Sequence, residues 1–249
     1  MDKRIPPPPW RIFTARSLQK HENDERIDMR VILFANGRID DYNAIRPFLR
    51  AYHFMICCDG GVRHAKALGL VPDVILGDLD SAPPDILMEW QAQNVPVVVY
   101  PTDKDFTDLE LAIAYIREQM AGQDISLDIF GALGGRFDHS LMNCHILLQA
   151  LQAGLHARLV DEYAIVTLID ESIRLMGKAG EIVSLIPLTT ETEGVETEGL
   201  RYPLCDETLR VGYGRGVSNV MTGDAAAVRV KKGLLLVIQA SCASMRFPA

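Results

Sequence analysis

The sequence lacks two features that would place the protein in a membrane or on nucleic acid. No apolar run approaches the roughly 20 residues that a membrane-spanning helix needs. The 249 residues also lack a basic excess, because 33 Asp and Glu outweigh 25 Lys and Arg and give a formal net charge of -8. Sequence-independent binding of nucleic acid requires a positively charged surface. We therefore expect small ligands as partners, with no nucleic acid and no membrane.

Cysteine is scarce and shows no metal-site spacing. The five cysteines form no CxxC pair, and most of them sit in apolar stretches: Cys57, Cys58, Cys144, Cys205 and Cys242. This usage predicts reduced, buried thiols and a cytoplasmic protein. The stretch Met1–Trp10 holds charges and four consecutive prolines but no apolar signal core. We expect residues 1–27 to form a loose amino-terminal arm and secretion to be absent.

Residues 28–161 alternate between strand-like and helix-like patterns. Short runs of consecutive apolar residues are typical of parallel strands covered on both faces: Val31–Ala35, Phe54–Cys58, Val74–Leu76, Val95–Tyr100, Leu127–Phe130 and Ala157–Val160. Between them, apolar residues recur every three or four positions in Val62–Leu68, Pro84–Gln93, Thr107–Met120 and Phe137–Gln152. This part predicts an α/β fold with a mostly parallel sheet and flanking helices.

Residues 162–249 have a different character. Many short β-rich runs are punctuated by glycine, with no helical stretch of useful length: Ala164–Ile169, Ile173–Met176, Glu181–Pro187, Ala226–Val230 and Leu234–Gln239. This spacing predicts an all-β sandwich domain following the α/β domain, with the boundary near Asp161–Tyr163. We interpret Thr189–Glu198 as a short acidic, threonine-rich turn region.

Four polar motifs occupy equivalent positions, each directly after a predicted strand of the α/β part. They are Asp59–Gly61, Gly77–Ser81, Asp103–Asp108 and Gly131–His139. The carboxyl edge of an open α/β sheet is where ligands bind. Clustered carboxylates repel one another, and a bound cation removes that penalty. Since Mg²⁺ favours oxygen ligands and substrate phosphates, the set predicts a metal–nucleotide site.

Each motif also has a simpler structural interpretation. Asp78 and Asp80 are two residues apart, so an extended segment would point both the same way, but either could instead cap the helix that begins after Pro83. Thr107 or Asp108 could likewise cap the next helix. Capping explains one residue of a motif and not several, and both interpretations remain open from the residues alone.

The glycine turn at Gly131–Gly135 precedes a helix, where backbone amides and the helix dipole favour an anion. Arg136 beside it can fork onto phosphate oxygens, and Lys104 is a compact charge suited to phosphate. Asp138 and His139 follow one turn into the helix. The sequence holds neither a GxGxxG dinucleotide fingerprint nor a Walker GxxxxGK[ST] loop, so those nucleotide-binding classes lose support.

Taken together and in this order, the four motifs resemble the thiamine pyrophosphokinase family from about Val31 to Asp161, and more weakly through Gly216–Asn219. The resemblance implies a homodimer with thiamine held between subunits. It implies catalytic roles for Asp78, Asp80, Asp108 and Arg136, with the three aspartates as Mg²⁺ ligands. The residues implied for ATP are Asp59, Gly60, Gly61, Ser81, Lys104, Asp105, Thr107, Arg136 and Asp138, and those implied for thiamine are Ser218 and Asn219.

The expected reaction is transfer of pyrophosphate from ATP to the thiamine hydroxyl, which gives thiamine diphosphate and AMP. Such transfer relies on positioning and electrostatics and needs no covalent enzyme nucleophile. Two other functions could use the same residues. A metal-dependent phosphohydrolase would activate water instead, and a nucleotide sensor would bind ATP without chemistry.

Overall fold

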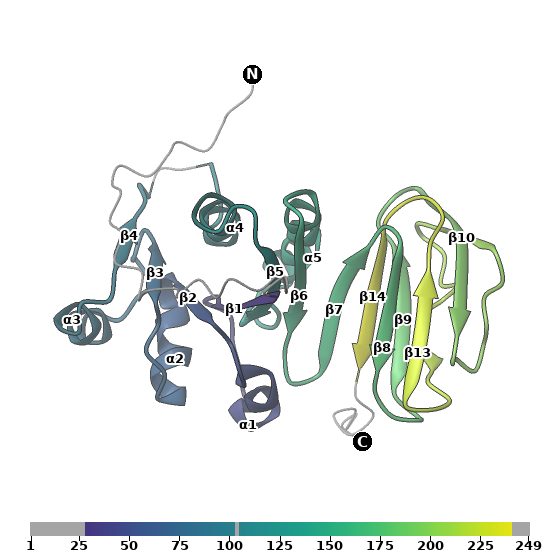
Figure 1. Ribbon diagram of the computed structural model, residues 1–249, viewed down its shortest axis with the longest axis horizontal. Coiled ribbons are helices and arrows are strands. Elements are labelled where there is room, and N and C mark those ends of the chain that lie inside the picture. Colours follow the sequence, from purple (N-terminus) through teal and green to yellow (C-terminus); the bar gives the residue numbers. More distant parts are fainter. Residues whose placement is uncertain (1–27, 103–104, 241–249) are drawn as a thin grey trace, which may run out of the picture.

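The computed structural model describes residues 28–102 and 105–240. The amino-terminal arm, Lys104 and Cys242 lie outside these residues. The chain forms an α/β half and a β-rich half that lie side by side (Figure 1). This arrangement confirms the fold class predicted from the alternation of patterns along the sequence.

Six strands of the α/β half form a parallel sheet in the order β4-β3-β2-β1-β5-β6. Their bounds are β1 Asp28–Phe34, β2 Phe54–Cys58, β3 Val74–Gly77, β4 Val97–Val99, β5 Asp124–Phe130 and β6 Leu155–Val160. The chain runs outward from β1 to β4 and then crosses back to β5 on the other side of β1. The topological switch point of this sheet therefore lies between β1 and β5, where a ligand crevice is expected.

Helices cover both faces of that sheet, as the continuous apolarity of its strands requires. The helices are α1 Tyr42–Ile45, α2 Val62–Leu68, α3 Pro84–Ala92, α4 Asp108–Gln119 and α5 Phe137–Gln152, with 3₁₀ turns at Arg46–Leu49 and Asp59–Gly61. One buried cluster joins the sheet to α4 and α5, and another joins it to α1, α2 and α3. Proline at the first position of α3 and glycine in the left-handed conformation after α2 match their usual places at helix ends.

The β-rich half is a sandwich that shares its first sheet with the α/β half. Strand β7 pairs antiparallel with β6, and the large sheet continues through β14, β9 and β12. A second sheet, ordered β11-β10-β13-β8, packs against this continuation. The strands are β7 Ala164–Ile169, β8 Ser172–Met176, β9 Ile182–Pro187, β10 Glu191–Glu198, β11 Glu207–Arg210, β12 Asn219–Val220, β13 Ala225–Arg229 and β14 Leu235–Ala240. Since the sheet is not interrupted at Asp161–Tyr163, the division into domains at that point stays a proposal.

The interpretation of Thr189–Glu198 as a turn region is wrong, because eight of these residues form β10. The threonines of this strand are buried and satisfied: the Thr192 hydroxyl donates to the Leu234 carbonyl at 3.0 Å, and the Thr197 hydroxyl accepts from the Leu204 amide at 2.8 Å. Glutamates on the opposite face pair with basic residues of neighbouring segments. An acidic, threonine-rich composition therefore conceals a strand whose partners lie far away in the sequence.

Cysteine burial agrees with the sequence in part. Cys57 and Cys58 are buried in β2 and form no disulfide, and Cys144 is half-buried, whereas Cys205 is exposed.

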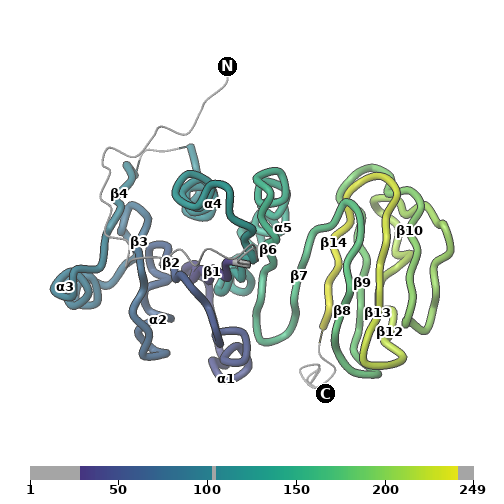
Figure 2. Tube along the Cα trace, in the orientation of Figure 1, coloured from purple at the N-terminus to yellow at the C-terminus, as the bar shows by residue number. Residues whose placement is uncertain are grey.

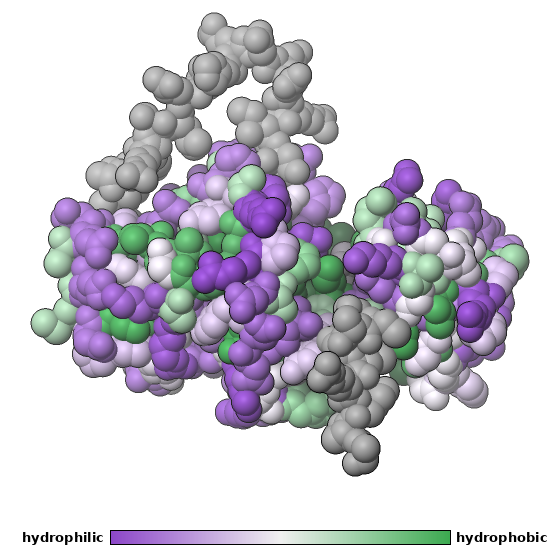
Figure 3. Space-filling view, turned by 90° about the horizontal axis from the view of Figure 1, so that it is seen from below, coloured by the Kyte–Doolittle hydropathy of each residue, from purple (hydrophilic) through white to green (hydrophobic). Residues whose placement is uncertain are grey.

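Hydrophilic side chains spread over both halves when the molecule is seen from below (Figure 3). Among the described residues, no helix combines the length and apolarity that crossing a membrane requires.

Candidate active site

Strand pairing brings three aspartates together at the carboxyl edge of the sheet. Cys58 at the end of β2 is the register partner of Leu76 in β3, so Asp59 emerges beside Gly77 and Asp78. Each of Asp59, Asp78 and Asp80 offers a carboxylate oxygen, and these oxygens lie within 4.8 Å of one another. The sequence placed Asp59 in the ATP site, and the structure adds it to the candidate metal ligands.

An unusual backbone shapes this carboxylate group. Asp59 and Leu79 have positive φ angles of 46° and 66°, which L residues with side chains rarely adopt. The strand ends also approach closely, because a Cβ added to Gly77 would lie 3.1 Å from that of Asp59. Backbone strain of this kind costs of order 1–3 kcal/mol at each position and concentrates at functional sites.

The electrostatics of the group favour a cation. Burial raises the pKa of Asp59, and the negative charges of Asp108 and Asp80 raise it further, against hydrogen bonds from the amides of Gly60 and Ser81. Asp78 is half-buried and Asp80 is exposed, so the group opens to solvent on one side. A divalent cation in this position would be held by oxygen ligands that repel one another without it.

Thr107 and Glu110 form the cap at the start of α4. The Thr107 amide and hydroxyl donate to Glu110 at 2.8 and 2.9 Å, and the Glu110 amide donates back to the hydroxyl at 3.3 Å. This is a complete capping box, and it realises the simpler interpretation of Thr107. Asp108, the first residue of α4, lies outside the group of three aspartates but near enough to raise the pKa of Asp59. Asp105 is exposed on the preceding segment.

Arg136 and Asp138 form a pair at the start of α5. The Arg136 guanidinium donates to the Asp138 carboxylate at 3.1 and 2.5 Å, and both side chains are well exposed. This pairing lowers the pKa of Asp138 to about 2. Gly134 and Gly135 before it have φ angles of 82° and 84°, which glycine adopts without strain. The arrangement leaves an open turn and an accessible guanidinium at the amino end of a helix.

Sequence reasoning missed a second set of residues beside the site. Asn36 follows β1, and its side-chain oxygen accepts from Arg63, whose other terminal nitrogen donates to the Ser81 carbonyl at 3.1 Å. The neighbouring His64 is buried between the Tyr42 hydroxyl and the Gly37 carbonyl. The position of Asn36 and Gly37 in the sequence could have identified this set, because both residues directly follow a predicted strand and so lie at the same sheet edge as the four motifs.

The structure keeps the predicted thiamine residues apart from the carboxylates within one chain. Ser218 is exposed with a positive φ of 58°, and Asn219 begins β12 at the far end of the large sheet (Figure 2). The strands β9, β14, β7, β6, β5 and β1 lie between β12 and β2. At about 4.8 Å per strand, these seven steps correspond to roughly 34 Å along the sheet. Asn219 is 3% exposed and bonds to the backbone of Tyr202.

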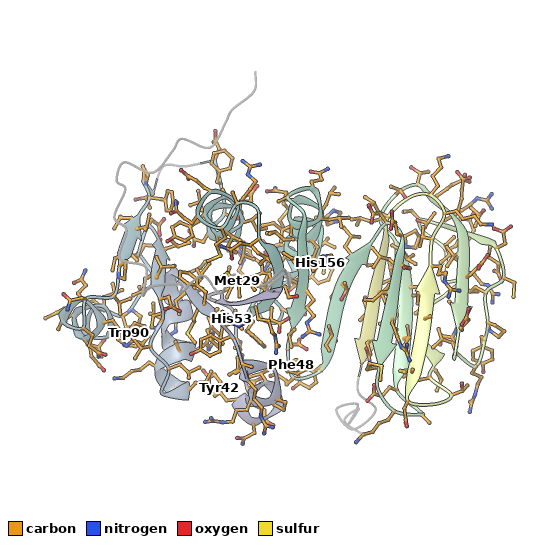
Figure 4. The ribbon with its side chains drawn as sticks, viewed as in Figure 1. Met29, Tyr42, Phe48, His53, Trp90 and His156 are labelled. Atoms are coloured by element: carbon orange, nitrogen blue, oxygen red, sulfur yellow. The ribbon has the colours of Figure 1, made fainter. Side chains whose placement is uncertain are left out.

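A wide groove of about 1560 Å³ lies where the two halves join, but the carboxylate group does not line it. Its walls include Phe48 and His156, which come from the segment after α1 and from β6 (Figure 4). Inside it, Asp128 is buried and pairs with the guanidinium of Arg158. This ion pair is satisfied within the chain, so the site is assigned to the sheet edge and not to the groove.

Two protein-family models match most of the chain in succession. Residues 45–159 match the catalytic domain of thiamin pyrophosphokinase, and residues 169–235 match its vitamin B1 binding domain. Thiamine pyrophosphokinase 2 of Arabidopsis thaliana is 31% identical over 175 residues, which cover 67% of this chain and 65% of that protein. The match thus spans less than two thirds of that relative. Thiamine pyrophosphokinase of Bacillus subtilis is 26% identical over 182 residues, covering 70% of this chain and 80% of its own length.

Solved structures show the same fold. The crystal structure of thiamine pyrophosphokinase from Bacillus subtilis superposes with a TM-score of 0.75 at 24% identity, covering 86% of this chain and 99% of that one. Thiamin pyrophosphokinase from Candida albicans superposes with a TM-score of 0.74 at 17% identity, covering 86% and 90%.

Proposed function

The chain belongs to the thiamin pyrophosphokinase family, and from this premise we propose that it transfers the terminal pyrophosphate of ATP to the hydroxyl of thiamine. The observation that carries the proposal is the group of Asp59, Asp78 and Asp80 at the carboxyl edge of the sheet. This edge lies within the region that matches the family's catalytic domain. It is also where open α/β sheets bind nucleotides.

The carboxylates fit a divalent cation, for which we propose Mg²⁺. Magnesium takes oxygen ligands and uses one or two carboxylates together with substrate phosphates. We assign Asp78, Asp80 and Asp108 as its protein ligands, following the resemblance, and add Asp59 on the geometry of the group. When bound, the ion would neutralise charge that develops on the phosphate oxygens.

The remaining chemistry needs positioning more than reactive side chains. The thiamine hydroxyl oxygen attacks the β-phosphorus, and the bond from that phosphorus to the α–β bridging oxygen breaks, so that AMP leaves. The hydroxyl proton passes to an aspartate of the site. Arg136 can exchange Asp138 for phosphate oxygens, since both side chains are exposed. Lys104, outside the described residues, would add a second positively charged side chain to the phosphate site.

Recognition of thiamine is assigned to Ser218 and Asn219 in the β-rich half. The roughly 34 Å that the strand order puts between β12 and β2 favours a site completed by a second copy of the chain. A homodimer in which the β-rich half of one subunit faces the sheet edge of the other would bring these residues to the phosphates. The proposed partners are therefore ATP, thiamine and a second copy.

One assay tests the reaction. The purified protein is incubated with ATP and Mg²⁺, with and without thiamine, and AMP and ADP are quantified. We expect AMP only when thiamine is present, in amounts equal to the thiamine diphosphate formed. ATP consumption without thiamine would identify a phosphohydrolase, and binding of ATP without any consumption would identify a sensor.

A further inference from the structure

Ser81 joins two of the three clustered aspartates. Its amide donates to the Asp59 carboxylate at 3.2 Å, and its hydroxyl donates to the Asp80 carboxylate at 2.9 Å. Its carbonyl oxygen accepts from Arg63 at 3.1 Å. All three polar groups of Ser81 are therefore engaged, two with carboxylates and one with a guanidinium.

Arg63 ties this residue to a third segment. Its second terminal nitrogen donates to the side-chain oxygen of Asn36. Asn36 follows β1, Arg63 lies on α2 and Ser81 follows β3, so one guanidinium connects three segments at the sheet edge. The rigid, planar fork of arginine suits such a bridge, because its donors keep a fixed relative geometry. The space is tight, since a Cβ on Gly60 would lie 2.0 Å from the Asn36 oxygen.

The segment that carries Asn36 is itself held in place by the next residue of α2. His64 is 6% exposed, with Nε2 at 2.7 Å from the Gly37 carbonyl and Nδ1 at 2.8 Å from the Tyr42 hydroxyl. Burial lowers the pKa of His64, so a neutral ring donates through Nε2 and accepts the Tyr42 hydroxyl at Nδ1. The segment that Arg63 binds through Asn36 is therefore held in place by His64.

We propose that Arg63 is a positioning residue for the divalent cation bound by Asp59, Asp78 and Asp80. The inference rests on the proposed function only in placing a cation at this group. Acting through Ser81, Arg63 keeps the Asp59 and Asp80 carboxylates in the arrangement that the cation needs. A purely electrostatic role predicts the opposite effect, because a nearby positive charge would weaken cation binding and its removal would strengthen it.

Mn²⁺ binding to the free protein separates the two roles. Dissociation constants are measured by electron paramagnetic resonance of unbound Mn²⁺ for the wild type, Arg63→Ala and Lys66→Ala. Lys66 is an exposed residue of the same helix that pairs with Glu89 and does not touch the carboxylates, so it is a matched control. We expect Arg63→Ala to bind Mn²⁺ about 10-fold more weakly, as when a residue that orients metal ligands is lost. Lys66→Ala should bind like the wild type.

Asn36→Ala provides a second variant that leaves the charge of the site unchanged. It removes the other anchor of the guanidinium and should also weaken Mn²⁺ binding, while Arg63→Lys should fall between Arg63→Ala and the wild type. Thermal denaturation checks that each variant is folded. Unchanged or tighter Mn²⁺ binding in folded Arg63→Ala would overturn the inference, as would a wild type that binds no Mn²⁺. A wild type that binds Mn²⁺ but forms no AMP with thiamine would remove the proposed function and leave the inference standing.

Discussion

The side-chain amide of Asn219 binds both backbone polar groups of Tyr202. Its oxygen accepts from the Tyr202 amide at 3.0 Å, and its nitrogen donates to the Tyr202 carbonyl at 2.7 Å. The same oxygen also accepts from the Val220 amide at 2.9 Å. Asn219 therefore shapes the loop that precedes β11, whereas the exposed Ser218 beside it is accessible to a ligand. The two residues proposed to recognise thiamine have different structural roles.

Asn219→Ala should reduce both stability and thiamine recognition. The truncation removes the buried side chain that pairs with both backbone groups of Tyr202, so the free energy of unfolding should fall by about 1–3 kcal/mol in denaturant titrations. The KM for thiamine should rise, and the affinity for ATP measured without thiamine should not change. Ser218→Ala should raise the KM for thiamine without the loss of stability. Normal thiamine kinetics in both folded variants would exclude these residues from the thiamine site.

Asp78→Asn or Asp108→Asn should lower kcat by about 100-fold or more while the protein stays folded, because a lost metal ligand removes several kcal/mol of charge stabilisation. A merely capping aspartate would cost only about 1 kcal/mol of stability. Asp85→Asn, an exposed aspartate in the first turn of α3, serves as the control and should keep wild-type activity. Near wild-type turnover in both site variants would favour capping.

The pKa of Asp138 should show whether Arg136 is paired with this carboxylate. Its depressed pKa of about 2 means that the contribution of the pair to stability is present above the ordinary carboxyl pKa near 3.8 and is lost as the pH falls through about 2. Carbon-13 NMR of the carboxyl group should show this midpoint in the free protein. Arg136→Ala should move it upward and weaken ATP binding more than it lowers Tm.

Binding of α,β-methylene ATP with Mg²⁺ should also raise the Asp138 midpoint, since the guanidinium would turn to the phosphates. A midpoint that the analogue leaves unchanged would argue against phosphate contact by Arg136.

His64 should make the protein less stable in mild acid. Its pKa is lowered by burial, so protons bind the unfolded chain more readily, and stability is lost as the pH falls from about 6.5 through the lower folded pKa. Urea denaturation between pH 7.5 and 5 should show this loss, and His64→Gln should reduce it. Equal pH dependence in both proteins would mean that His64 is not the group responsible.

Local sequence patterns were sufficient to predict most helices and strands of the α/β half. Consecutive apolar residues predicted the buried parallel strands, and the proline before α3 and the threonine before α4 predicted where those helices begin, because capping involves only residues a few positions apart. The sequence missed the short helix α1. It also missed β10, because the partners of Thr192, Glu193 and Glu198 lie about 30 to 40 residues away in the chain.

By itself, the sequence determined the order of elements, the four motifs at strand ends and the excess of carboxylates that calls for a cation. The tertiary structure decided which carboxylates meet. Asp59 joins Asp78 and Asp80 because β2 lies next to β3 in register, and Arg63 reaches Asn36 and Ser81 because β1 and β3 flank β2. The strand order likewise separates Asn219 from this site within one chain. Contacts of this kind depend on strand adjacency, which follows from packing of the whole sheet and leaves no signature in the local spacing of residues.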